Sequence, residues 1–94
     1  MQNDSLQTLI DQFISYKKQN GYTYQSGAYY LKKYALSVIE MRTTMIVPTK
    51  ESVEIFLGKY ENAPGSLYNA AAFLREFSRY LIARGYSEAY LIPS

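Results

Sequence analysis

Four stretches of this chain repeat apolar residues at every third or fourth position, and each stretch is bounded by residues that start or stop helices. This spacing places the apolar side chains along one face of an α-helix. A chain of 94 residues has room for one domain built around one core. The sequence therefore predicts an all-α fold, a bundle of four helices. The predicted helices cover residues 5–19, 23–41, 49–60 and 66–84.

Residues at the ends of these stretches have the chemistry that helix ends prefer. Ser5, Thr49 and Ser66 carry hydroxyl groups that can accept from the free N–H groups of a first turn. Gly21 and Gly85 follow the first and fourth stretches, and glycine readily adopts the left-handed conformation common after a helix. These signals fix the expected order of helix and turn along the whole chain.

The apolar stripes of the four stretches predict the core. The run 45–47 is short and has no partner strand in the sequence, so a buried connector is more plausible there than a sheet. The tyrosines fall largely on or beside the inner stripes, where a large ring with one polar end packs well. The residues expected to be most buried are Phe13, Leu31, Phe56, Leu74 and Phe77.

The composition excludes several classes of function. The chain has no cysteine and no histidine, which removes disulfides, thiolate metal sites and the commonest general base. No tyrosine has a histidine or a metal beside it that would activate it as a nucleophile. We therefore expect no catalytic residue, no metal and no cofactor. The sequence also predicts no signal peptide and no membrane span, which favours a cytoplasmic protein.

The positive charge is concentrated on two of the predicted helices. The net charge is only +2, but the second and fourth stretches each carry an excess of two positive charges. The side of the fourth helix opposite its apolar stripe pairs arginines with a tyrosine around Ala72, and the second helix repeats this arrangement with lysines. Arginine suits such a surface because its planar group can bind phosphate with two hydrogen bonds. The residues predicted to contact DNA are Gln25, Ser26, Tyr29, Lys32, Lys33, Tyr68, Arg75 and Arg79.

Two other interpretations of these faces stay open. Lysines and arginines on solvated helix faces occur in most soluble bundles, so the pattern alone does not establish DNA binding. Leu36 and Ile55 also fall on outward faces, and they would mark a contact in a small helical module that binds proteins rather than DNA.

The order and spacing of several motifs add a second argument. The segment 13–16 is followed by Asn20-Gly21-Tyr22, and the connector 47–49 precedes Phe56-Leu57. The most specific motif is Leu-Arg-x-Phe-x-x-Tyr-Leu over residues 74–81, followed by Gly85 and an exit that contains Pro93. Together these motifs resemble the core-binding domain of phage-integrase-type tyrosine recombinases over nearly the whole chain. Gly27, inside the first turns of the second helix, departs from the family pattern.

The resemblance implies a fold and a function. It implies a four-helix orthogonal bundle, the SAM-like core-binding domain, over residues 1–86, with an exit linker at 87–94 toward a C-terminal catalytic domain that this chain lacks. Such a domain helps to clamp double-stranded DNA at a recombination site, with its second and fourth helices toward the major groove. The expected partners are DNA and other recombinase protomers. The nucleophile and its helpers lie in the catalytic domain, so this chain itself is expected to be non-catalytic.

Overall fold

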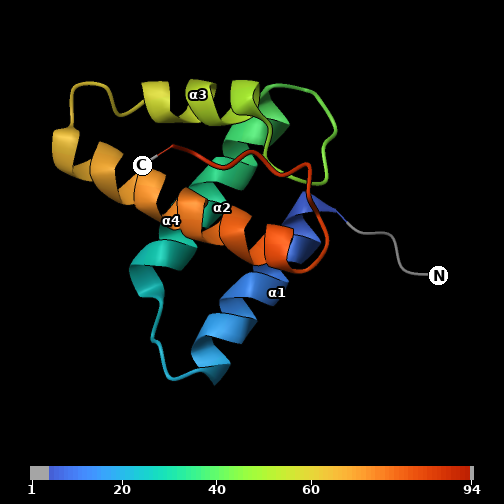
Figure 1. Cartoon of the computed structure of the whole chain (residues 1–94). Helices are drawn as coiled ribbons and strands as arrows, with labels where there is room; N and C mark the ends of the chain where they lie inside the picture. The colour runs from blue at the N-terminus through green and yellow to red at the C-terminus, as the bar shows by residue number, and fades with distance from the viewer. Residues whose placement is uncertain (1–4, 94) are drawn as a thin grey trace.

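A computed structural model describes residues 5–93 as four α-helices joined by short connections (Figure 1). The helices are α1 (Leu6–Gln19), α2 (Gln25–Glu40), α3 (Lys50–Gly58) and α4 (Pro64–Ala83). Figure 1 shows α4 crossing in front of α2, with α3 on one side of the crossing and α1 on the other. No β-strand occurs in the described residues, and the prediction of an all-α chain with four helices is confirmed.

Two of the predicted helix starts are confirmed by their capping hydrogen bonds. The hydroxyl of Ser5 accepts from the N–H of Thr8 at 3.1 Å and closes the first turn of α1. At the start of α3, the Thr49 hydroxyl accepts from the N–H of Ser52 at 3.2 Å. The Ser52 hydroxyl accepts in return from the N–H of Thr49 at 3.1 Å. This reciprocal pair is a capping box, which satisfies two backbone donors at once.

The predicted start of the fourth helix is wrong by about one helical turn. Ser66 was expected to cap this helix, but α4 already begins at Pro64, with Ala63 as its N-cap. Proline fits the first helical position because its fixed φ is helical and its missing N–H would have no partner there. Proline and glycine in sequence therefore mark the first turn of α4 rather than a separate turn before it.

The predicted core is confirmed. Phe13 lies near its centre, with ring centroids 5.5 Å from Tyr24, 5.4 Å from Phe77 and 4.8 Å from Tyr80. These contacts join α1, the start of α2 and α4 in one aromatic cluster. The five residues expected to be most buried are each at most 1% exposed: Phe13, Leu31, Phe56, Leu74 and Phe77.

The hydroxyl group of Tyr34 lies in the core and forms a hydrogen bond there. Its side chain is fully buried, and its hydroxyl shares a hydrogen bond of 2.7 Å with the hydroxyl of Ser52. Its ring packs edge-on against Phe56. Burial raises the pKa of Tyr34 to about 12, and the hydrogen bond with Ser52 opposes this rise. The core thus accommodates the neutral phenol and disfavours the phenolate.

We expect this burial to make the protein sensitive to alkaline pH. The contribution of Tyr34 is complete below pH ~10, the ordinary pKa of tyrosine, and is lost as the pH rises through the folded value of about 12. The wild-type chain should lose about 2 kcal/mol of unfolding free energy to this group by pH 12, whereas Tyr34→Phe should not. Urea unfolding at a series of pH values measures the difference, and parallel curves for the two proteins would contradict the assignment.

The chain after α4 folds back against the bundle. Ala89 is 6% exposed, and the N–H of Tyr90 donates to the carbonyl of the buried Pro48 at 2.9 Å. Tyr86 and Ile92 also pack against the core. In Figure 1 this segment runs back along α4 in the opposite direction. The described part of the predicted exit linker, residues 87–93, is therefore packed against the domain that it follows.

No helix within the described residues has the length and apolar character that crossing a bilayer requires.

Candidate nucleic-acid interface

The first turn of α2 is fixed in place by Tyr24, the residue that precedes it. Tyr24 has a left-handed backbone with φ of 53°, which is uncommon for a residue with a large side chain. Its ring packs edge-on against Phe13 and Phe73, so it bridges α1 and α4. Its hydroxyl donates to Glu76 Oε1 at 3.0 Å. Contacts with α1 and α4 therefore determine where α2 starts.

Glu76 joins the same region to α1 through an ion pair. Lys17 Nζ lies 2.7 Å from Glu76 Oε2, and only 13% of the Lys17 side chain is exposed. The ammonium group also lies 4.4 Å from the ring centre of Tyr22. Burial, the Glu76 carboxylate and the hydrogen bond to it all raise the pKa of Tyr24, so its hydroxyl stays protonated and continues to donate. Lys17 and Glu76 thus lock α1, α2 and α4 together.

This arrangement explains why glycine occupies position 27. A Cβ added to Gly27 would lie 2.3 to 2.7 Å from three ring atoms of Tyr24, which is closer than carbon atoms approach each other. Glycine at position 27 therefore has a local cause, because the Tyr24 ring occupies the space that a side chain would need.

Gly27→Ala is expected to destabilise the protein by roughly 1–2 kcal/mol. Forcing the Tyr24 ring away costs about 1–3 kcal/mol, and alanine recovers about 0.5–1 kcal/mol of helix propensity. Gly58→Ala is the matched control, since no atom lies within 4 Å of an added Cβ there and the helical gain should stabilise α3. Thermal unfolding of both variants compares them, and equal stabilisation by both would show that Tyr24 does not pack on Gly27.

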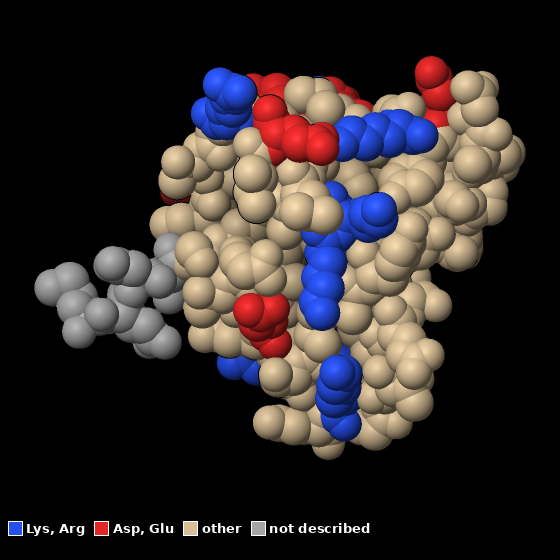
Figure 2. Space-filling view, turned by 180° about the vertical axis from the view of Figure 1, so that it is seen from behind, with Lys and Arg blue, Asp and Glu red and all other residues tan. Residues whose placement is uncertain are grey.

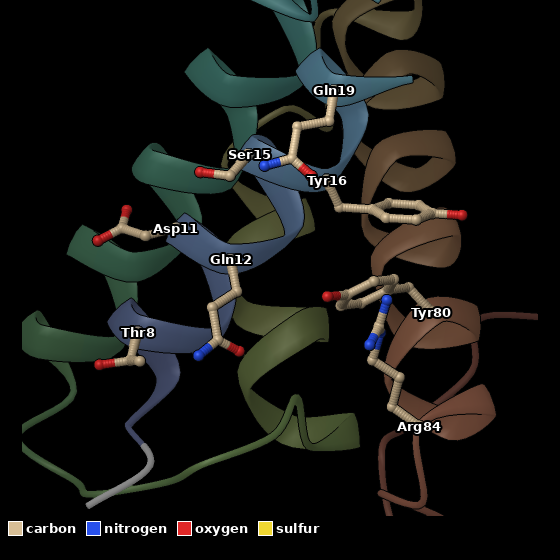
Figure 3. A pocket seen from close by; sticks show the side chains of 8 residues that line it. All are labelled: Thr8, Asp11, Gln12, Ser15, Tyr16, Gln19, Tyr80 and Arg84. Atoms are coloured by element: carbon tan, nitrogen blue, oxygen red, sulfur yellow. The ribbon is translucent and has the colours of Figure 1, made fainter. Parts of the chain in front are cut away.

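A groove runs along the seam between α1 and α4. Figure 3 shows one hollow of this groove, with side chains of α1 on one wall and Tyr80 and Arg84 on the other. A neighbouring hollow shares Tyr16, Tyr80 and Arg84 with it and continues past Arg79 to Lys17 and Glu76. We call this surface the α1–α4 seam. It carries three basic and two acidic side chains, and its residues are Thr8, Asp11, Gln12, Phe13, Ser15, Tyr16, Lys17, Gln19, Glu76, Arg79, Tyr80, Ala83 and Arg84.

The two arginines of the seam have no acidic partner in the described part of the chain. No carboxylate there lies within ion-pair distance of Arg79 or Arg84. The Arg84 guanidinium instead lies 4.5 Å from the ring centre of Tyr80 and 5.5 Å from that of Tyr16. Stacking of this kind orients the guanidinium and leaves its N–H groups able to donate at the edge. The seam therefore offers oriented donors to an anion.

A third hollow connects the seam to the first turn of α2. Lys17 and Glu76 line both this hollow and the seam, and Gln25 and Ser26 line its other end. No side chain caps the first turn of α2, so its N–H groups are available and the positive end of the helix dipole points outward. The fold thus brings together three of the residues predicted for DNA: Gln25, Ser26 and Arg79.

Four other predicted residues lie away from the seam. Tyr29 and Lys33 line a groove between α2 and α3, and the Lys33 ammonium lies 5.5 Å from the Tyr29 ring centre. Lys32 is exposed on α2, and Tyr68 is 74% exposed in the first half of α4. Figure 2 shows a column of Lys and Arg side chains on the side of the molecule opposite the view of Figure 1. Basic side chains of the described residues therefore also lie outside the seam, at Lys32 and Lys33.

The expectation that Arg75 is free on an outward face of α4 is wrong. Arg75 is half-buried, and its guanidinium donates to the backbone carbonyls of Ile92 at 3.1 Å and Pro93 at 3.2 Å. The helical wheel placed Arg75 opposite the apolar stripe correctly, but the chain after α4 returns over that side. Arg75 therefore contacts the protein's own backbone.

Sequence reasoning missed Arg84, Tyr16 and Tyr80 as parts of the surface. A signal was present, because Tyr80 and Arg84 are four residues apart and so adjoin on one helix face. Tyr16 joins them only through the crossing of α1 and α4, which no local pattern reveals.

Comparison of the chain with family models, curated proteins and solved structures gives no match. The geometry of the seam and the motifs of the sequence are therefore the grounds on which a function can be argued.

Proposed function

We propose that this chain is a double-stranded-DNA-binding module that holds one strand's backbone along the α1–α4 seam. The observation that carries the proposal is the position of Arg79 and Arg84, which have no acidic partner among the described residues and line a groove. The first turn of α2, with Gln25 and Ser26, extends this surface. Guanidinium groups and free helix N–H groups both favour phosphate.

The opposite wall of the seam supports the same ligand. Gln12, Ser15 and Gln19 present amide and hydroxyl groups along α1, beside the Asp11 carboxylate, which accepts from Gln7. Such uncharged donors make many of the contacts that position proteins on DNA phosphates and sugars. Arg79 and Arg84 line the same hollow of the seam, so both guanidinium groups border the path proposed for the DNA backbone.

The family proposed is the tyrosine recombinases of the phage-integrase type, on the strength of the motif order in the sequence. In this proposal the four helices form the SAM-like orthogonal core-binding domain of residues 1–86. The chain would then help to clamp a recombination site during DNA integration or excision, beside other recombinase protomers. Cleavage would belong to a separate catalytic domain, and this module would carry none of its chemistry.

The first experiment is a titration of a short fluorescently labelled duplex with the chain, followed by fluorescence anisotropy at low salt. We expect binding that weakens with added salt and has a Kd of about 10⁻⁴ to 10⁻⁶ M near physiological salt, because half of a clamp makes few phosphate contacts. A labelled acidic protein of similar size is the control for nonspecific charge attraction. Equal affinity for that control, or no anisotropy change with DNA, would contradict the proposal.

A protein-interaction module is the second candidate function. Leu36 is 55% exposed and lines the groove between α2 and α3, and Ile39 on the same helix is 68% exposed. Exposed aliphatic residues beside a groove are typical of surfaces that bind other proteins. The substitution Leu36→Asp separates the two candidates, since it should leave DNA binding unchanged if the seam is the working surface.

A further inference from the structure

The chain after α4 is held to the bundle at two levels. We call residues 89–93 the C-terminal strap. At its start, Ala89 is buried and the N–H of Tyr90 donates to the carbonyl of Pro48. At its end, the Arg75 guanidinium donates from Nε to the carbonyl of Ile92 and from Nη2 to that of Pro93. The strap is therefore held at one end by the connector before α3 and at the other end by the middle of α4.

The contacts of Arg75 suit the retention of a backbone segment. Two neighbouring carbonyls accept from two separate N–H groups of one planar guanidinium, so both the position and the direction of the strap are specified. Lysine could not do this, because its ammonium is a single point on a flexible stem. Arg75 also lies only one helical turn from Arg79, which has no acidic partner among the described residues. Two arginines of the same helix thus have different surroundings.

We propose that Arg75 is a positioning residue that clamps the C-terminal strap to α4, rather than a DNA contact. It fixes the point on α4 at which residue 93 lies. In a recombinase, and here the inference rests on the proposed function, this clamp would set the direction in which the chain leaves the core-binding domain toward the catalytic domain. Arg75 then orients the core-binding domain relative to the catalytic domain, while Arg79 contacts the DNA.

Hydrogen–deuterium exchange of the whole chain tests the clamp without any DNA. In Arg75→Ala the N–H of Tyr90 should exchange about tenfold faster than in the wild type, a change equivalent to about 1.4 kcal/mol. Arg79→Ala, the control one turn away, should leave that exchange unchanged. Arg75→Lys should recover little of the protection, because it restores the charge but not the paired donors, and it also serves if the alanine variant fails to fold.

DNA titrations of the same variants separate this inference from the proposed function. Arg75→Ala should leave the slope of log affinity against log salt unchanged, whereas a phosphate contact would lower it by about 0.9. Unchanged strap exchange in Arg75→Ala, or full protection in Arg75→Lys, would overturn the clamp. If no variant binds DNA while Tyr90 still loses protection, the clamp stands and the proposed function fails.

Discussion

Phe77→Ala is expected to remove about 3–5 kcal/mol of unfolding free energy, the usual cost of deleting a buried aromatic ring. Phe77 is fully buried on α4, and its ring lies 5.4 Å from that of Phe13 on α1. The cavity left would open the contact between these helices. A domain of this size has roughly 5–14 kcal/mol of total stability, so a large share of it depends on one side chain.

Urea unfolding followed by circular dichroism measures this effect. Tyr68→Ala is the matched control, because it also removes an aromatic ring from α4 but at a site that is 74% exposed. The control should change stability by no more than about 0.5 kcal/mol. A cost below about 1 kcal/mol for Phe77→Ala, well short of the expected range, would show that α4 does not face the core with this residue.

The second large effect is expected on DNA binding. The double variant Arg79→Ala, Arg84→Ala should lower the slope of log affinity against log salt by almost two, since each phosphate contact contributes about 0.9. Its affinity should fall about tenfold or more for each arginine, because a hydrogen bond to a charged group contributes about 1.5–3 kcal/mol. The unfolding free energy should fall by no more than about 1 kcal/mol, since both residues are exposed and Arg84 loses only its contacts with the Tyr80 and Tyr16 rings.

The double variant Lys32→Ala, Lys33→Ala is the control for this effect. It removes the same charge from exposed positions on α2, where Lys33 faces the groove toward α3 rather than the seam. We expect it to weaken binding only by the long-range effect of net charge, with little change in the salt slope. If this variant lost more affinity than Arg79→Ala, Arg84→Ala, the basic surface of α2 would be the contact surface instead.

The local pattern of the sequence was sufficient for the helices and the core. The apolar spacing identified Phe13, Leu31 and Phe77 as core residues, and all are buried. The same pattern misjudged the start of α4, because proline and glycine occur both in turns and in the first turn of a helix. The identities of Pro64 and Gly65 alone therefore do not locate the start of the helix.

The candidate site was predictable only in part, because it is assembled by tertiary contacts. A helical wheel shows which residues leave the apolar stripe, and it correctly turned Arg79 outward. It cannot show that α1 lies beside α4 and places the Tyr16 ring near the Arg84 guanidinium. Nor can it show that the chain after α4 returns over Arg75. The apolar residues Ala89 and Ile92 were the available signal for that return.

The proposal that DNA lies along the α1–α4 seam is tested most directly by nuclear magnetic resonance. The ¹⁵N-labelled chain is titrated with a short duplex at low salt, and the amide shifts are followed residue by residue. The account predicts the largest shifts at Gln25 and Ser26 and at the arginines 79 and 84, with small shifts in α3. Shifts concentrated around Leu36 and the α2–α3 groove, or no shift at saturating duplex, would contradict it.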